Sequence, residues 1–309
     1  MKFSIVVPTY NEQNDIGETL DALVSLSYPD KEILVVDDST DRTPEIVNEY
    51  SGRGVRLIHP GGGGRCEARN LGIQMASGDV VCVLNADVRL PPDFLDKIAV
   101  HYRNGFDYVM VETKVSNEED LFARYIGSAW AAGYNPQTVA AGKSMDWTEG
   151  FSCRRDIALR AGLFPTGFVV PICAGEDGYF GAGLRKIGAK RKVDFDTVVE
   201  HVCPASLGEY WMIRKGRGSG SAECHRLLDR WSYSRLFAWN ALKVAKTVAM
   251  ALLIVPAIFV NWNIAKFSPR GRKDTLPFLW AWLVEQLAFH VGEWQASFRI
   301  MRKERLARA

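Results

Sequence analysis

The sequence predicts an α/β fold, with a mostly parallel sheet carrying helices on both faces and a membrane-associated helical hairpin after it. Short apolar runs alternate with stretches of helical period over the first 111 residues, which is typical of a doubly wound parallel sheet. The run 80–84 is apolar without alternation, as expected when helices cover both faces of a sheet. Residues 247–265 contain no charged side chain, which predicts contact with lipid.

The elements of the sheet follow one another in order. Strands are expected at 3–7, 32–36, 55–58 and 80–84, and helices at 15–27, 43–50 and 67–75, with four glycines at 61–64 before the last of these helices. Right-handed crossovers would join the strands. From 112 to 225 the pattern is less regular, with helices expected at 154–161 and 178–187 and a strand at 190–199. We therefore predict one domain over 1–225, with halves 1–111 and 112–225, and a helical region over 226–309.

Composition narrows the class of protein. A net charge of +2 with 24% charged residues gives no reason to expect a nucleic-acid partner. The six cysteines lack Cys-x-x-Cys spacing, which argues against a zinc site and for reduced thiols in the cytosol. Met1 leads directly into a strand-like run, so we expect the first domain to stay on the cytoplasmic side.

The hydrophobic C-terminal region admits three arrangements. Segments 247–265 and 275–292 approach the ~20 residues that a membrane span requires, although polar residues recur in the second at Gln286, His290, Glu293 and beyond. Two spans would place the basic loop 266–273 opposite the basic tail 299–308, against the positive-inside rule. We favour a monotopic hairpin that is re-entrant at Pro256, with its second segment in the interface. A buried core hairpin is the third possibility.

Acidic and amide side chains recur where the predicted strands end. They occur in Val-Val-Pro-Thr-Tyr-Asn-Glu (6–12), Val-Val-Asp-Asp-Ser (35–39), Leu-Asn-Ala-Asp (84–87) and, later, Gly-Glu-Asp-Gly (175–178). The carboxyl ends of parallel strands meet at one edge of a sheet, where ligands bind. The pattern predicts a site for a charged substrate that is bridged by a metal ion.

These motifs, together with Ala-Arg-Asn-Leu-Gly (68–72), resemble those of the family 2 inverting glycosyltransferases, which have the Rossmann-like GT-A fold. The resemblance covers roughly residues 3–221 and includes polyprenyl- and dolichol-phosphate sugar synthases. It implies that 1–111 binds a nucleotide sugar and that 112–225 forms the acceptor side. The Gln-x-x-Arg-Trp motif expected of processive relatives is missing, which favours the transfer of a single sugar.

The resemblance assigns the donor-binding residues. Pro8, Thr9, Tyr10 and Glu12 would line the nucleotide pocket, Asp37 would accept hydrogen bonds from the base or ribose, and Asp38 would hold the loop. The alternative is that both aspartates only cap the helices that follow. Arg69 would reach the nucleotide or its phosphate. The glycines at 61–64 would admit the donor or form a surface turn.

Asn85, Ala86 and Asp87 occupy the place of the family's Asp-x-Asp metal signature. The resemblance therefore implies Mg²⁺ or Mn²⁺ on the donor diphosphate, held by Asp87, with a neutral amide at Asn85 in place of a carboxylate. His201 matches a metal-site histidine of some relatives, and a structural role is its alternative.

The general base is expected in the last acidic motif. An inverting displacement needs one base to take the acceptor proton, and the resemblance points to Asp177 with Glu176 beside it. The alternative is an acidic pair favoured by a helix N-terminus. Farther on, an aromatic and basic patch that includes Arg214 and Arg217 would clamp the donor diphosphate, hold a lipid phosphate, or form a solvated helix face.

The sequence thus predicts a membrane-associated, metal-dependent inverting glycosyltransferase. It would move one sugar from a UDP- or GDP-sugar to a polyprenyl phosphate or lipid-linked glycan at the cytosolic leaflet, contacting membrane lipids through 247–300. One alternative extends a saccharide or modifies a soluble acceptor. Another is a non-catalytic nucleotide-binding scaffold or a nucleotidyltransferase, although the glycine-rich, lysine-bearing loop usual in the latter does not follow the first strand.

Overall fold

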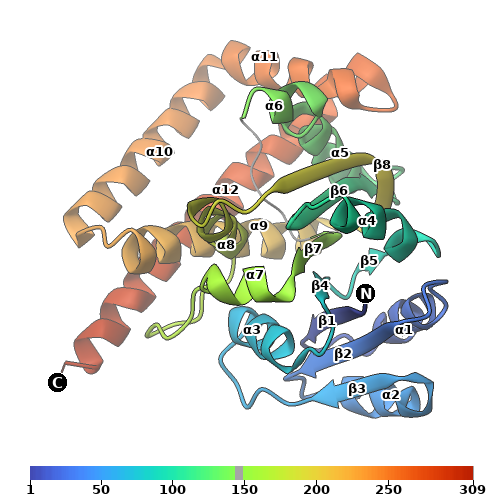
Figure 1. Ribbon diagram of the computed structural model, residues 1–309. Coiled ribbons are helices and arrows are strands. Elements are labelled where there is room, and N and C mark those ends of the chain that lie inside the picture. Colours follow the sequence, from blue (N-terminus) through green and yellow to red (C-terminus); the bar gives the residue numbers. More distant parts are fainter. Residues whose placement is uncertain (143–148, 309) are drawn as a thin grey trace. The chain divides into compact units, whose positions relative to one another are not determined.

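The computed structural model describes residues 1–142 and 149–308. The chain forms two compact units that are not contiguous in sequence. The first, here the sheet unit, comprises the described residues of 1–114, 145–166 and 176–201, and the second, the helical unit, comprises those of 115–144, 167–175 and 202–309. Each is described by itself (Figure 1).

The described strands form one eight-stranded sheet in the order β3-β2-β1-β4-β7-β6-β8-β5. The first four in this order are parallel: β1 (Phe3–Thr9), β2 (Lys31–Asp37), β3 (Val55–Ile58) and β4 (Val80–Val83). The rest pair antiparallel where registers are defined: β7 (Phe151–Arg154) with β4 and β6 (Tyr108–Val115), and β5 (Val88–Arg89) with β8 (Arg191–His201). The predicted parallel sheet is confirmed up to β4, and beyond it the sheet is mixed.

Six α-helices of the sheet unit pack around these strands. They are α1 (Ile16–Val24), α2 (Thr43–Glu49), α3 (Arg65–Met75), α4 (Phe94–Arg103), α7 (Arg155–Arg160) and α8 (Glu176–Lys186), with a 3₁₀ turn at Ser51–Arg53. The main core joins apolar faces of α1 and α4 to the sheet through Leu20, Ile98 and Val109. Helix α3 lies very close to the strands, since a Cβ on Gly72 would fall 2.2 Å from Val6 Cγ1.

The helical unit contains α5 (Leu121–Gly133), α6 (Pro136–Ala140), α9 (Leu207–Glu223), α10 (Tyr233–Leu253), α11 (Val255–Ile264) and α12 (Thr275–Leu306). A π turn at Cys224–Leu228 and 3₁₀ turns at Ala265–Phe267 and Gly271–Asp274 connect them. A Cβ on Gly218 would lie 1.9 Å from the Phe289 carbonyl oxygen, and one on Gly292 would lie 2.0 Å from that of Lys215. The backbones of α9 and α12 therefore touch, which joins α9 to the C-terminal helices, whereas we predicted a boundary near residue 225.

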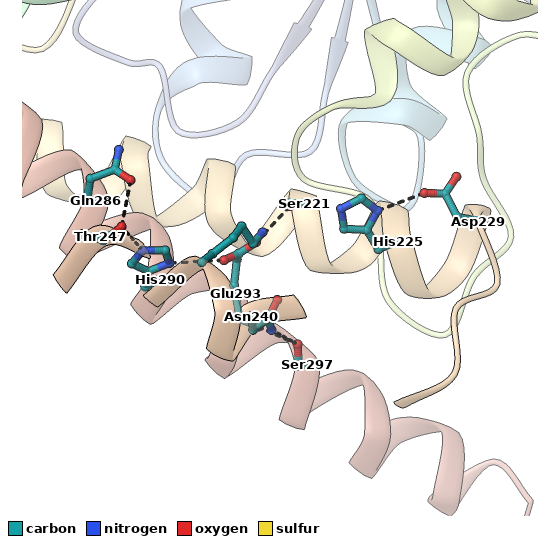
Figure 2. Close-up of polar contacts among 10 residues, drawn as sticks. Ser221, His225, Asp229, Asn240, Thr247, Gln286, His290, Glu293 and Ser297 are labelled. Carbon is teal, nitrogen blue, oxygen red and sulfur yellow. Dashed lines mark hydrogen bonds and ion pairs between the residues drawn. The ribbon is translucent and has the colours of Figure 1, made fainter. Parts of the chain in front are cut away.

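Helix α10 turns its polar side chains inward and its apolar ones outward. Figure 2 shows Thr247 bonded to His290 (2.9 Å) and Asn240 to Ser297 (3.1 Å), and Lys243 also pairs with the fully buried Glu293. Exposed apolar side chains continue along α10 and α11 at Trp239, Leu242, Val248, Leu252, Leu253, Val255 and Phe259. In the part of the chain that the structure describes, α10 alone is long and apolar enough to cross a membrane. The break expected at Pro256 lies two residues earlier, where Ile254 has φ 49° between α10 and α11.

Candidate active site

The loops after β1 and β2 are tied together at the carboxyl edge of the parallel strands. Thr9 and Asp37 are register partners, and the Thr9 hydroxyl donates to Asp37 Oδ1 over 2.7 Å. The Ser39 hydroxyl donates to the same oxygen over 2.5 Å, and the Ser39 amide donates to Oδ2 over 3.2 Å. Asp37 is 1% exposed. Its carboxylate holds the turn after β2 through these hydrogen bonds.

The two aspartates of this motif make different loop contacts. We expected Asp37 to contact the nucleotide and Asp38 to hold the loop, but the loop-holding hydrogen bonds belong to Asp37. Among the described residues Asp38 has no side-chain hydrogen bond and is half-buried. Beside it, Tyr10 is exposed, which leaves its ring accessible for stacking.

Helix α3 brings two arginines to this edge. The glycines at 61–64 all have positive φ, from 76° to 104°, a conformation that side chains other than glycine rarely adopt, and they lead directly into α3. Arg69 lies three residues before Gly72 and so on the face that packs against the strands. Arg65, four residues before Arg69, shares this face nearer the solvent.

The Arg69 guanidinium holds two carboxylates and an amide. Its Nη1 donates to Glu176 Oε1 over 2.7 Å and to Asp177 Oδ1 over 3.0 Å, and its Nη2 donates to Asn85 Oδ1 over 3.0 Å. It also lies over the Phe164 ring at 5.0 Å. The resemblance places Arg69 to reach the nucleotide or its phosphate; in the structure its side chain is buried and bonded to protein groups, which joins β4, α3 and the start of α8.

The two adjacent carboxylates that Arg69 binds lie in unequal environments. The side chain of Glu176 is 3% exposed and that of Asp177 is 27% exposed. Burial and the charge of Glu176 raise the pKa of Asp177 to about 7, against the opposing charge of Arg69. Asp177 is thus an accessible carboxyl that can accept or release a proton near neutral pH.

Asp87 and His201 meet because β5 and β8 are paired, with Val88 opposite His201. His201 Nε2 lies 2.8 Å from Asp87 Oδ2, and the bond and charge of His201 outweigh desolvation to lower the pKa of Asp87. Burial and the charge of Asp87 raise the pKa of Glu12. Asp87 and His201 would suit a divalent cation whose other ligands are oxygen atoms. The described residues contain no group of three or more His, Cys, Asp or Glu side chains suited to holding a metal alone.

Arg65 was missed by the sequence analysis. Its Nη1 lies 3.9 Å from Glu176 Oε1 and its side chain is about half exposed. Its charge opposes the raised pKa values of Glu12 and Asp177 and contributes to the lowered pKa of Asp87. The spacing of four residues from Arg69 on a helix was the signal that could have found it.

The predicted basic patch lies in the helical unit and is largely structural at Arg214. The Arg214 guanidinium is buried, pairs with Glu285 at 3.1 Å and lies over the Tyr210 ring at 5.0 Å. Arg217 is exposed on the same helix. The prediction that Arg214 clamps a diphosphate did not anticipate this ion pair.

Comparisons with known proteins bear on the family and the fold. Residues 4–164, more than half of the chain, match the family model described as Glycosyl transferase family 2. Similar proteins include a dolichol-phosphate mannosyltransferase of Pyrococcus furiosus, 40% identical over 35% of this chain, and the probable glycosyltransferase YdaM of Bacillus subtilis, 40% identical over 33% of this chain. The matches cover 32% and 25% of these two relatives' own lengths.

Solved structures share the fold. The mannosyltransferase PcManGT from Pyrobaculum calidifontis, in complex with GDP-Man and Mn²⁺, is 20% identical with a TM-score of 0.60, over 96% of this chain and 86% of that one. S. aureus TarS in complex with UDP-GlcNAc is 17% identical with a TM-score of 0.54, over 95% and 90%. The GT-A fold expected from the motifs is confirmed.

Proposed function

Because this chain belongs to glycosyl transferase family 2, we propose that it transfers a single sugar, with inversion, from a UDP- or GDP-sugar to a lipid-linked acceptor. Asp177 is the general base of this proposal. The observation that supports this role is the difference between two adjacent carboxylates. Glu176 is buried against Arg69, whereas Asp177 is accessible and has a pKa of about 7.

The reaction is a displacement at the anomeric carbon. An acceptor hydroxyl oxygen forms the new bond while the bond to the diphosphate breaks, and the hydroxyl proton passes to an Asp177 oxygen. The diphosphate leaves with the bonding electrons. Arg69 and Glu176 do not touch the reacting atoms in this scheme; they fix the position of the base.

The donor contacts proposed here come from the β1 and β2 loops and from α3. Tyr10 stacks on the nucleotide base, Asp38 accepts hydrogen bonds from base or ribose, and Arg65 faces the diphosphate, since it is the cation with the exposed side chain on α3. Pro8, Thr9 and Glu12 complete the pocket wall. A Mg²⁺ or Mn²⁺ held by Asp87 and His201 would neutralise the departing diphosphate.

Membrane association is proposed for the turn between α10 and α11. Residues 247–265 carry no charge, and Leu252, Leu253 and Val255 at the turn are each at least 65% exposed. Lys246 remains exposed on α10, and Lys266, Arg270, Arg272 and Lys273 follow α11. An apolar tip with a basic rim suits a hairpin inserted into one leaflet, with its cations at the headgroups. We propose the cytosolic leaflet, where anionic lipids attract such a rim.

Lipid-linked acceptors are supported by the printed activities of relatives. These include the dolichol-phosphate mannosyltransferase and an undecaprenyl-phosphate 4-deoxy-4-formamido-L-arabinose transferase of Pectobacterium carotovorum, 32% identical over 40% of this chain. A polyprenyl phosphate and a lipid-linked glycan differ chemically. A phosphate oxygen is already ionised near pH 7, whereas a sugar hydroxyl must lose its proton during attack.

The test is a matrix of donors and acceptors with purified full-length protein. UDP- and GDP-sugars, including UDP-GlcNAc and GDP-Man, are mixed with polyprenyl phosphate, a lipid-linked glycan or a soluble saccharide, with Mn²⁺, Mg²⁺ or chelator, and products are detected by mass. We expect metal-dependent transfer of one sugar to a lipid-linked acceptor. Transfer only to the soluble saccharide would overturn the acceptor assignment, and nucleotide binding without any transfer or donor hydrolysis would overturn the enzymatic one.

A further inference from the structure

One end of the helical unit is strongly basic. The last turns of α12 and the start of α10 meet there, where Arg226 pairs with Glu304. Glu304 also pairs with Arg308, so its charge is already offset. The exposed cations around it form what we call the basic end: Arg230, Arg235, Arg302, Lys303 and Arg305. This concentration of positive charge contrasts with a net charge of +2 for the whole chain.

Aromatic rings lie next to these cations. The Arg235 guanidinium lies over the Trp231 ring at 3.9 Å, and Phe237 of α10 contacts Phe298 of α12 with ring centres 5.1 Å apart. Phe298 is exposed, and Arg302 follows it by four residues, so both lie on one face of α12. Cations bordered by accessible aromatic rings are typical of segments at the headgroup level of a membrane.

The exposed apolar surface of α10 and α11 has cations beyond both of its ends. This surface runs from Trp239 to Phe259. The basic end precedes it, and the segment 266–273 follows it with exposed Lys266 and Arg270. Helix α10 alone, with 21 residues, is about 30 Å long. The helical unit therefore presents a long apolar strip with positive charge at each end.

Lys246 indicates how this strip meets a bilayer. It is exposed on α10, four residues after Leu242 and so on the same outer face. In a helix that crosses the membrane, its ammonium would lie in the hydrocarbon, where a charge is costly. In a helix that lies along the membrane surface, the four-carbon stem carries the ammonium to the headgroups.

We propose that α10 lies along the surface of an anionic membrane, and that the basic end binds the headgroups of anionic lipids there. The inference rests on the proposed membrane association and deepens it, because it adds a second headgroup contact and a direction for α10. Charge and apolar surface together identify the partner. A nucleic acid would match the cations but not the apolar strip beside them.

The test neutralises three cations of the basic end in one variant, Arg302→Gln with Lys303→Gln and Arg305→Gln. All three are exposed on the last turns of α12, so the fold should be retained. Binding of the full-length protein is measured by flotation with two kinds of vesicle. One is phosphatidylcholine alone, and the other contains about one third phosphatidylglycerol, which supplies the negative surface potential.

We expect the neutralised variant to bind the anionic vesicles about a hundredfold more weakly than the wild type, since each basic residue near such a surface contributes about fivefold. Binding to phosphatidylcholine alone should not change. Arg302→Lys with Arg305→Lys keeps the charge and should bind as the wild type does. The matched control, which should also bind normally, removes three exposed cations of the sheet unit: Arg103→Gln, Lys186→Gln and Lys190→Gln.

The direction of α10 has its own readout. Ala238 and Ala249 are exposed and eleven residues apart, so they lie on nearly the same face. A fluorophore is attached at Ala238→Cys or Ala249→Cys in a Cys173→Ser background, because Cys173 is exposed and the other cysteines are buried. Brominated lipids should quench both fluorophores. Quenching at 249 but not at 238 would mean that the protein stands on the α10–α11 turn alone, which would overturn the proposed direction.

The inference and the proposed function fail in different ways. If the neutralised variant binds anionic vesicles normally while Leu252→Glu loses binding, the basic end is not a lipid contact, and the proposed membrane association stands. If the wild type prefers a DNA duplex to anionic vesicles at equal salt, and the neutralised variant loses that preference, the basic end is a nucleic-acid site and the inference is wrong. Wild-type protein that binds anionic vesicles through the basic end but transfers no sugar would contradict only the proposed function.

Discussion

Two buried arginines show how the same ion-pair chemistry serves different ends. In the helical unit, Arg124 Nε donates to Asp274 Oδ2 over 2.8 Å, and its Nη1 donates to the backbone oxygens of Glu118 and Glu119. Both charged side chains are at most 4% exposed. In the sheet unit, Arg69 is equally buried but faces two carboxylates, one of which is accessible.

The difference lies in the balance of charge. Two arginines face one aspartate in the helical unit, since Asp274 also lies 3.6 Å from Arg270, and backbone oxygens accept from Arg124, so the cluster pins α5 to the start of α12. In the sheet unit, among the described residues, Arg69 is bonded to two carboxylates; burial and then the charge of Glu176 raise the pKa of Asp177 to about 7. The first arrangement is suited to holding helices together and the second to moving a proton.

The sharpest test of this contrast is Asp177→Asn. We expect transfer to a hydroxyl acceptor to fall about 10²–10⁴-fold, because no base remains to take the proton. The free energy of unfolding should not fall, since one of two crowded carboxylates is neutralised. Initial rates and urea unfolding at pH 8 measure both.

Asp156→Asn is the control for this variant, because Asp156 lies on α7 with a side chain that is 71% exposed. It should change neither quantity. Transfer to a phosphate acceptor should depend less on Asp177 than transfer to a hydroxyl. Full activity of Asp177→Asn with hydroxyl acceptors would remove Asp177 as the base.

The opposite result is expected for the helical pair. Arg124→Met removes the buried partner of Asp274 and leaves it with Arg270 at 3.6 Å and the Ser268 hydroxyl, which should lower the free energy of unfolding by about 3 kcal/mol. The double variant Arg124→Met with Asp274→Leu should recover most of this loss. Urea denaturation of the full chain checks it, and kcat of the folded fraction should stay close to that of the wild type. A loss below about 1 kcal/mol would mean that this pair does not pin the helices.

Stability should depend on pH through Asp177. Its pKa is raised from 3.8 to about 7 in the folded protein, so between these values the native state binds more protons than the unfolded state and stability falls as pH rises. Relative to Asp177→Asn, the wild type should lose on the order of 2–4 kcal/mol between pH 4 and 7 and change little above it. Urea midpoints across this range decide it, and parallel curves for both proteins would contradict the raised pKa.

The smallest expected effect concerns the membrane tip. Leu252→Glu replaces an apolar side chain that is 80% exposed next to the α10–α11 turn, and binding to anionic vesicles should fall about tenfold. Met75→Glu, which changes an exposed methionine of the sheet unit, is the matched control. Equal loss in both variants, or none in either, would argue against insertion of the tip.

Parts of the site could be predicted from the sequence and parts could not. Acidic residues at the ends of β1, β2 and β4 were expected to share an edge, because strand periodicity and parallel pairing are local and regular. The hydrogen bonds that hold the loop were predicted for Asp38 and are made by Asp37. The hydrogen bond from Thr9 to Asp37 depends on the pairing of β1 with β2, which places these two residues opposite each other.

The burial of Arg69 likewise could not be predicted from its motif. An arginine in a nucleotide-binding family is expected to reach phosphate, but the close packing of Gly72 on Val6 draws α3 against the strands and brings Arg69 to residues more than 100 positions away in the chain. Arg214 likewise forms an ion pair with Glu285, a residue far from it in the chain.

By itself the sequence determined the fold class, the strand ends that carry the acidic motifs, the family, and a break in the hydrophobic region near Pro256. These follow from periodicity, residue type and short spacings, which act over a few residues. Only the tertiary structure decided which carboxylate is sealed and which is accessible, that Asn85 faces Arg69, and that α9 belongs with α12. Burial and charge pairing depend on groups that the chain brings together from distant positions, and no local pattern encodes them.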